Sequence, residues 1–158
     1  MGTFFQVKLY KDFRQNTPHI VGELHQTGDI PTPRCGHTLN LVHTSDESFL
    51  VLWGGVEMDR RHDTSPLLTS RFSQVCRDSS LYIFNNYSWT HKETFLKARA
   101  FHTTAVINEN SLLICGGVEF DGRVCTSRAD ILHIVKLHFH NSNSFNMEVI
   151  TITGRPIY

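Results

Sequence analysis

The sequence predicts an all-β fold made of repeated four-stranded units, and two observations carry that prediction. A seven-residue phrase occurs twice, as WGGVEMD from Trp53 and as CGGVEFD from Cys115, 62 positions apart. The same lead, Arg-x-x-His-Thr, precedes both copies and begins at Arg34 and at Arg99. A lone Gly-Gly is a weak turn signal, whereas two glycine pairs that share both flanks indicate a repeated structural unit.

Each unit holds four runs of strand-forming residues, separated by polar residues of the kind found in turns. In the first unit, HTLNLVH and FLVLW precede the glycine pair, and SLYIFNN and SWTHKETF follow it. In the second unit, FHTTAVI and SLLIC precede the pair, and ADILHIVKLHF and FNMEVITIT follow it. Four antiparallel strands make up one β-propeller blade, so we expect one blade over 34–95 and another over 99–153.

The residues before the first unit predict the end of an earlier blade. TFFQVKLY and HIVGELHQ, within residues 3–26, have the pattern of a third and a fourth strand. The final TGRPIY resembles the stretch that leads into the first unit. At about 60 residues per unit, even a four-bladed ring needs about 240 residues. We therefore expect about two and a half blades, in a β-propeller that further blades or another chain would complete.

The glycine pair that ends a second strand resembles the kelch repeat. Glycine suits this place because it leaves no Cβ where strands crowd together and allows positive φ in the turn that follows. We expect the arginine and histidine of each lead to bind neighbouring backbone groups, and Trp89 to fill the core between blades, with Phe145 near the matching place. The residues assigned to this kelch motif are Arg34, His37, Gly54, Gly55, Trp89, Arg99, His102, Gly116 and Gly117.

A long insertion follows the first glycine pair, over residues 56–78. Compact domains seldom carry structureless loops beyond about 12–15 residues unless those loops are functional or disordered. Arg60 and Arg61 are balanced by acidic neighbours, which favours a solvated loop and leaves a partner surface as the alternative.

The stretch GDIPTPRCGHTLNLVHTSDESFLVLWGG, followed by this insertion, resembles a blade of the V(D)J recombination-activating protein 2 family. The stretches AFHTTAVINENSLLICGG and RADILHIVKL resemble that family's next blade.

This resemblance implies a nuclear, non-catalytic subunit that binds the catalytic recombinase subunit and assists DNA binding and cleavage. Lys11 and Arg14 lie in the region where that family carries basic residues near DNA. With Arg60 and Arg61 they are candidate contacts for DNA or a partner, although a solvated loop is the plainer interpretation. The sequence departs from the family in lacking its other blades and its Cys/His-rich histone-reading finger, so histone reading is not carried over.

Composition and motifs argue against several other function classes. Lys plus Arg and Asp plus Glu number 15 each, so no overall field attracts nucleic acid or an anionic membrane. No apolar run approaches the roughly 20 residues that span a bilayer, and the four scattered cysteines favour a reducing compartment. His138 and His140 share one face of a predicted strand, but no third ligand is spaced to join them.

Without a nucleophile elbow, a phosphate loop or an H-E-x-x-H motif, we expect no enzyme activity, no cofactor and no small-molecule substrate. Two other function classes stay open. A kelch adaptor, which presents substrates to a ubiquitin ligase or to the cytoskeleton, would normally carry an upstream dimerisation domain. A propeller oxidase would need a copper constellation of Tyr, Cys and His, which the sequence does not display.

Overall fold

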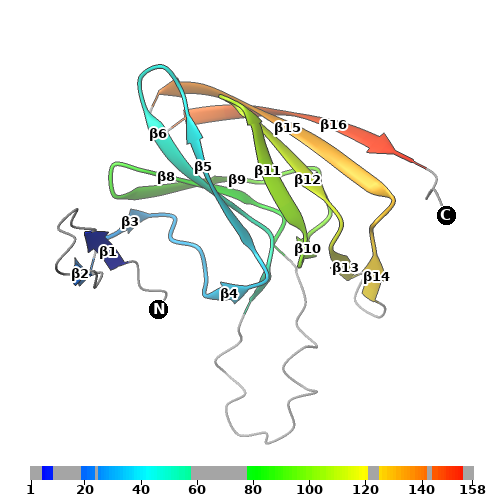
Figure 1. The fold of residues 1–158 in the computed structure, drawn as a ribbon, viewed down its shortest axis with the longest axis horizontal. Coiled ribbons are helices and arrows are strands. Elements are labelled where there is room, and N and C mark those ends of the chain that lie inside the picture. The colour runs from blue at the N-terminus through cyan, green and yellow to red at the C-terminus, as the bar shows by residue number, and fades with distance from the viewer. Residues whose placement is uncertain are drawn as a thin grey trace, which may run out of the picture.

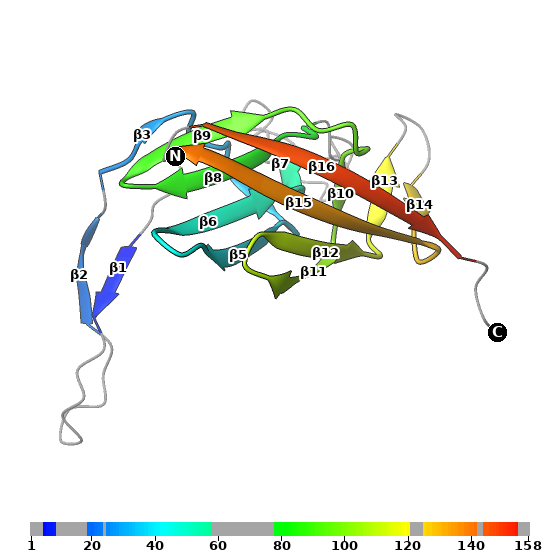
Figure 2. The ribbon, with the colours of Figure 1, turned by 90° about the horizontal axis from the view of Figure 1, so that it is seen from above.

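The computed structural model of the chain describes residues 5–8, 19–23, 25–57, 78–120, 125–141 and 144–154. All regular elements in these ranges are β-strands, and the two largest sheets belong to the two repeat units (Figure 1). At the N-terminal side, β1 (Phe5–Lys8) pairs antiparallel with β2 (His19–Glu23). This hairpin lies at the side of the first unit that is remote from the second (Figure 2).

The first unit forms a four-stranded antiparallel sheet, here called blade 1, with the order β5-β6-β8-β9. The short β3 (Thr27–Gly28) adds to its last strand in parallel. Burial alternates along β8, as the period of two in a strand requires when one face is covered. The four strands are β5 (Thr38–His43), β6 (Ser48–Trp53), β8 (Leu81–Asn85) and β9 (Ser88–Lys92).

The second unit forms an equivalent antiparallel sheet, blade 2, with the order β11-β12-β15-β16. Its last hairpin is much longer than that of blade 1, because the two strands have 11 and 10 residues. The four strands are β11 (Thr103–Asn108), β12 (Ser111–Cys115), β15 (Ile131–Asn141) and β16 (Ser144–Thr153).

A small outer sheet extends each blade beyond its glycine pair. In the first unit, β4 (Arg34–Cys35) pairs with β7 (Val56–Glu57), so the first two residues of the predicted 56–78 insertion are strand. The insertion was expected to begin directly after the glycines. Two residues directly after a turn are too short a pattern to predict a strand. In the second unit the same place holds β10 (Arg99–Ala100), β13 (Val118–Phe120) and β14 (Cys125–Ser127).

The main core lies between the facing surfaces of the two blades. Trp53 of blade 1 is 1% exposed and is among the largest fully buried side chains. Phe49 of blade 1 stacks on Phe139 of blade 2 with ring centroids 4.0 Å apart. Burial of this apolar surface drives the blades together. The buried members of the cluster are Val42, Phe49, Val51, Trp53, Leu81, Ile83, Leu96, Leu112, Ile114, Val135, Leu137 and Phe145.

The face of blade 2 that is turned away from blade 1 also carries apolar side chains, but these are less buried than the apolar side chains of the core. Ile83 on β8 is 2% exposed, whereas Ile134, at the matching register position on β15, is only half-buried. Ile150 and Ile152 on β16 are 37% and 48% exposed. Two open four-stranded blades, packed face to face around an apolar core, form part of a β-propeller. The predicted all-β fold with a partial β-propeller is therefore confirmed.

Candidate interaction site at the glycine-pair corners

The glycine pairs make the sharp turns between each blade and its outer sheet. All four glycines of the two pairs have φ between +68° and +96°, a conformation that glycine adopts without strain. A Cβ on Gly55 would lie 2.8 Å from the Cβ of His37, and a Cβ on Gly117 would lie 2.8 Å from that of His102. Each pair therefore leaves room for the histidine of its own lead, which explains why the two motifs occur together.

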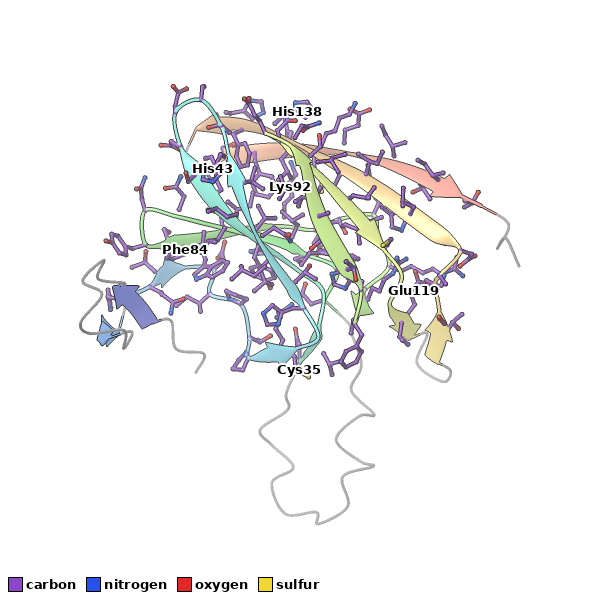
Figure 3. The ribbon with its side chains drawn as sticks, in the orientation of Figure 1. Cys35, His43, Phe84, Lys92, Glu119 and His138 are labelled. Atoms are coloured by element: carbon purple, nitrogen blue, oxygen red, sulfur yellow. The ribbon has the colours of Figure 1, made fainter. Side chains whose placement is uncertain are left out.

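Both turns lie at one end of the blades, here called the corner end. Cys35 and Glu119, which belong to the two outer sheets, lie at this end in Figure 3. His43 and His138 lie at the other end, where residues 44–47 and 108–110 form hairpin turns; this is called the hairpin end. The residues that border the 58–77 segment, Glu57 and Asp78, lie at the corner end, because β7 ends at Glu57 and β8 begins beside the end of β6.

Arg34 connects the two borders of the 58–77 segment. Its side chain is 2% exposed and donates to the Asp78 carboxylate at 2.9 Å and to the carbonyl oxygen of Gly54 at 3.1 Å. The Glu57 carboxylate forms a longer ion pair with the same guanidinium at 3.5 Å. Since Glu57 precedes the segment and Asp78 follows it, Arg34 fixes how far apart its two ends lie. Buried, charge-assisted bonds of this kind are among the stronger ones in proteins.

The surroundings of Arg34 keep its carboxylate partner charged. Burial by itself would raise the pKa of Asp78, but hydrogen bonds from the Ser80 amide, Arg34 and Tyr82 outweigh it and hold that pKa below its ordinary value. Tyr82 donates to Asp78 at 2.8 Å, and burial together with this bond raises the pKa of Tyr82 to about 12. The guanidinium also lies 5.1 Å from the centroid of the Tyr82 ring, within the range of a cation–π contact.

Arg99 occupies the same place in the second unit. It is 1% exposed and donates to the carbonyl oxygen of Gly116 at 3.1 Å and to the Glu119 carboxylate at 2.5 Å. The Nε2 atom of His133 lies 3.3 Å from the guanidinium. Burial, followed by the charge of Arg99, lowers the pKa of His133. Both lead arginines thus bond the first carbonyl of their own glycine pair and a carboxylate of the outer sheet.

His102 connects blade 2 to blade 1. Its Nε2 atom lies 2.9 Å from the Thr38 hydroxyl, and its ring meets that of Trp53 edge-on with centroids 4.6 Å apart. The sequence predicts a bond from His102 to a neighbouring backbone group, but His102 bonds a side chain of the neighbouring blade. The reason is space: a Cβ on Gly54 would lie 2.6 Å from the His102 ring. Glycine at that position admits the ring.

Acid is expected to weaken the fold between about pH 6.5 and pH 4. Burial, followed by the charges of Arg99 and His37, lowers the pKa of His102 to about 4. Below pH 6.5 the unfolded chain takes up a proton that the folded chain excludes, so stability present above pH 6.5 falls by roughly 2–3 kcal/mol as the pH approaches 4. Urea unfolding at several pH values measures this slope.

His102→Asn should flatten that dependence. His37 and His133, whose pKa values are also lowered, account for the slope that remains. Equal slopes for the unmodified chain and the His102 variant would contradict the assignment.

The two corners differ in what faces them. A Cβ on Gly54 would lie 2.3 Å from the carbonyl oxygen of Arg99, whereas nothing in the described residues lies within 4 Å of the corresponding point on Gly116. The Gly55 amide donates to that same Arg99 carbonyl at 2.8 Å. The lead of blade 2 therefore fills the corner of blade 1, and the corner of blade 2 is open in the described part of the chain.

The aromatic residues of the last strands are not equivalent, contrary to the expectation from sequence. Trp89 is 1% exposed, donates to the Gln26 side chain at 2.7 Å and lies against Phe84, on the face of blade 1 that is turned away from blade 2. Its register position corresponds to Val149 in blade 2. Phe145 lies four residues earlier, in the core between the blades. The longer β15-β16 hairpin explains the displacement.

Two exposed aromatic side chains at the corner end were not predicted. Phe95 is fully exposed and follows Thr94, whose hydroxyl donates to the carbonyl oxygen of Ser79 at 2.7 Å, next to the Asp78 border of the 58–77 segment. Phe101, directly after β10, is 58% exposed. Phe101 has a φ of +55° and its amide donates to the carbonyl oxygen of Gly36 at 2.8 Å, so the backbone there is held in place. Phe95 and Phe101 lie outside the strands, so no alternation of apolar and polar residues indicates whether they are buried. Residue type alone does not distinguish an exposed phenylalanine from one in the core. Aromatic residues are enriched at protein interfaces.

The remaining predicted contacts lie outside the described residues. This holds for Lys11, Arg14, Arg60 and Arg61, and so for most of the insertion. Among the residues that the structure describes, no group of three or more His, Cys, Asp or Glu side chains is placed to hold a metal ion. The described elements include no helix long and apolar enough to span a membrane.

Fold and corners together define the class: a partial β-propeller with a repeated Arg-His-Gly-Gly corner. No family model and no curated protein matches the sequence. Among solved structures, the chain is similar to a chain in the cryo-EM structure of RAG in complex with one melted RSS and one unmelted RSS, with a TM-score of 0.70 and 17% sequence identity. The likeness covers 94% of this chain and 41% of that one, so this chain spans less than half its length. At this identity the likeness is one of fold.

Proposed function

We propose that the chain is part of a non-catalytic accessory subunit of a DNA recombinase. It binds the catalytic recombinase subunit and assists DNA binding and cleavage in the nucleus. The observation that carries this proposal is the fold likeness over 94% of the chain to a chain of a RAG complex with RSS. The kelch assignment of the two corners and the family resemblance in sequence, including the insertion after the first glycine pair, support the same conclusion.

The corner end is the part of the chain that binds the partner. Repeat scaffolds fix their strands and leave the connecting loops free to meet other molecules. Arg34 holds the two borders of the 58–77 segment at this end, and Phe95 and Phe101 are exposed beside it. Exposed aromatic side chains beside the borders of the inserted segment favour this end as the interface, because aromatic residues are enriched at protein interfaces.

The first test replaces residues 58–77 of the full-length protein with a short Gly/Ser linker. The flanking strands should stay paired, because the β6-β8 hydrogen bonds and the Arg34 bonds to Glu57 and Asp78 do not pass through the segment. Co-purification with the catalytic recombinase subunit, at two salt concentrations, should fall relative to the unmodified protein. Arg60 and Arg61 lie in the replaced segment, so a loss that is smaller at the higher salt concentration would favour a charged contact, because salt screens exposed charges.

Two other outcomes are informative. Intact association after the replacement would remove this segment from the interface while leaving the subunit proposal in place. No association by the unmodified protein, together with capture of a cullin-type ligase, would overturn the proposal in favour of a kelch adaptor.

A further inference from the structure

A groove of about 1160 Å³ opens at the hairpin end, at the junction of the two blades. Three segments line it: the β5-β6 turn from Thr44, the β11-β12 turn around Glu109, and the part of β15 from Leu137 to His140. His43 and His138 mark this end in Figure 3, across the molecule from Cys35. The groove therefore lies away from the corner end. A role for this groove is additional to the function proposed above.

The floor of the groove is aromatic and rigid. Phe49 of blade 1 and Phe139 of blade 2 stack nearly parallel, with centroids 4.0 Å apart and planes at 8°. Phe49 and Leu137 are fully buried, whereas Phe139 is half-buried and lines the groove. Because one ring comes from each blade, the packing that joins the blades also fixes the shape of this floor.

The rim of the groove carries negative charge. Asp46, Glu47 and Glu109 contribute three carboxylates from two different turns, and no lysine or arginine is among the described lining residues. The whole chain has equal numbers of acidic and basic residues, so this charge is a local concentration. The Asn85 side chain donates to Glu47 at 3.1 Å. That bond orients one of the three carboxylates from outside the groove.

We propose that this groove binds an arginine-bearing segment of a protein partner. A guanidinium pairs with carboxylates through parallel hydrogen bonds and also stacks on aromatic rings, so it matches both the rim and the floor. Apolar residues beside the arginine would cover the exposed part of Phe139. The phosphates of a nucleic acid would be repelled by three carboxylates, so charge complementarity selects the basic peptide.

The test titrates a fluorescent peptide of alternating arginine and leucine residues with the full chain and follows its anisotropy. Asp46→Asn/Glu109→Gln removes two rim charges from exposed turns. Glu93→Gln/Asp130→Asn, two exposed carboxylates that do not line the groove, is the matched control with the same change in net charge. The rim variant should bind the peptide about tenfold more weakly, and the control should change affinity less than about twofold. Circular dichroism verifies that both variants keep the sheet content.

Four results would overturn the proposal. The first is an absence of binding by the unmodified chain, and the second is an equal loss of affinity in the rim and control variants. The third is displacement of the peptide by a single-stranded oligonucleotide that binds with undiminished affinity to the rim variant, which would assign the region to nucleic acid. Tighter binding of a glutamate-for-arginine peptide would contradict the charge argument as well.

Discussion

Ile83→Ala is expected to lower the free energy of unfolding by about 2–5 kcal/mol, because the deleted atoms leave a cavity in the core between the blades. Ile83 is 2% exposed and belongs to the apolar cluster that both blades share. Urea unfolding, followed by circular dichroism, measures the change.

The chain supplies its own control for this substitution. Ile134 is the same residue type at the matching register position of blade 2, where the face is only half-covered. Ile134→Ala should therefore cost about 1 kcal/mol or less, since surrounding side chains and water can occupy the space that is lost. Equal losses of unfolding free energy at the two positions would mean that Ile134 is as well buried in solution as Ile83, which would contradict the structure.

Arg99→Met is the second substitution with a large expected effect, about 3–5 kcal/mol of destabilisation. The change removes a buried cation and leaves the Glu119 carboxylate and the Gly116 carbonyl without their donor. Arg128 lies 3.8 Å from Glu119, too far to form an equivalent hydrogen bond. The unfolding free energy in urea is again the measurement.

A double-mutant cycle isolates the Arg99–Glu119 pair. Adding Glu119→Gln to the Arg99 variant should restore part of the lost stability, because it removes the charge of a buried carboxylate that has lost its hydrogen-bond donor. Additive costs for the two single substitutions would show that the pair is not coupled and would contradict its role in holding the corner.

The sequence repeat was sufficient to predict the corners and the main strands. Two glycine pairs with shared flanks indicate positive φ at equivalent turns, and all four glycines have it. Alternating apolar residues indicate strands with one covered face, as β8 shows. These features depend on residues within a few positions of each other, so a single sequence contains the information.

The rest depends on contacts between distant residues. Nothing local in the sequence shows that Arg34 bonds Asp78, 44 positions away, or that His102 bonds Thr38, 64 positions away. The short strand β7 follows a turn directly and has no period to detect. Phe145 stands near the place in the second unit that matches Trp89 in sequence, but the longer β15-β16 hairpin puts Val149 at the equivalent register position.

The candidate site was predictable in the same partial way. The insertion after the first glycine pair indicated which loop to examine, but the exposed Phe95 beside it emerged only from the arrangement of β9 and β10 in space. Phenylalanine is more often buried than exposed, so a sequence argument assigns it to the core. Its full exposure is a property of the folded chain.

The central claim is that the corner end binds the catalytic recombinase subunit, and the affinity of two matched variants tests it most directly. Phe95→Asn removes the fully exposed aromatic at the corner end, and Tyr87→Asn removes one that is 58% exposed in the β8-β9 turn at the hairpin end. Neither should change stability by more than about 0.5 kcal/mol. Phe95→Asn should weaken binding of the catalytic subunit by about tenfold or more, as the loss of an aromatic hot spot does, and Tyr87→Asn should leave it unchanged. Unchanged binding by the Phe95 variant together with weakened binding by the Tyr87 variant would place the partner at the opposite end and contradict the account.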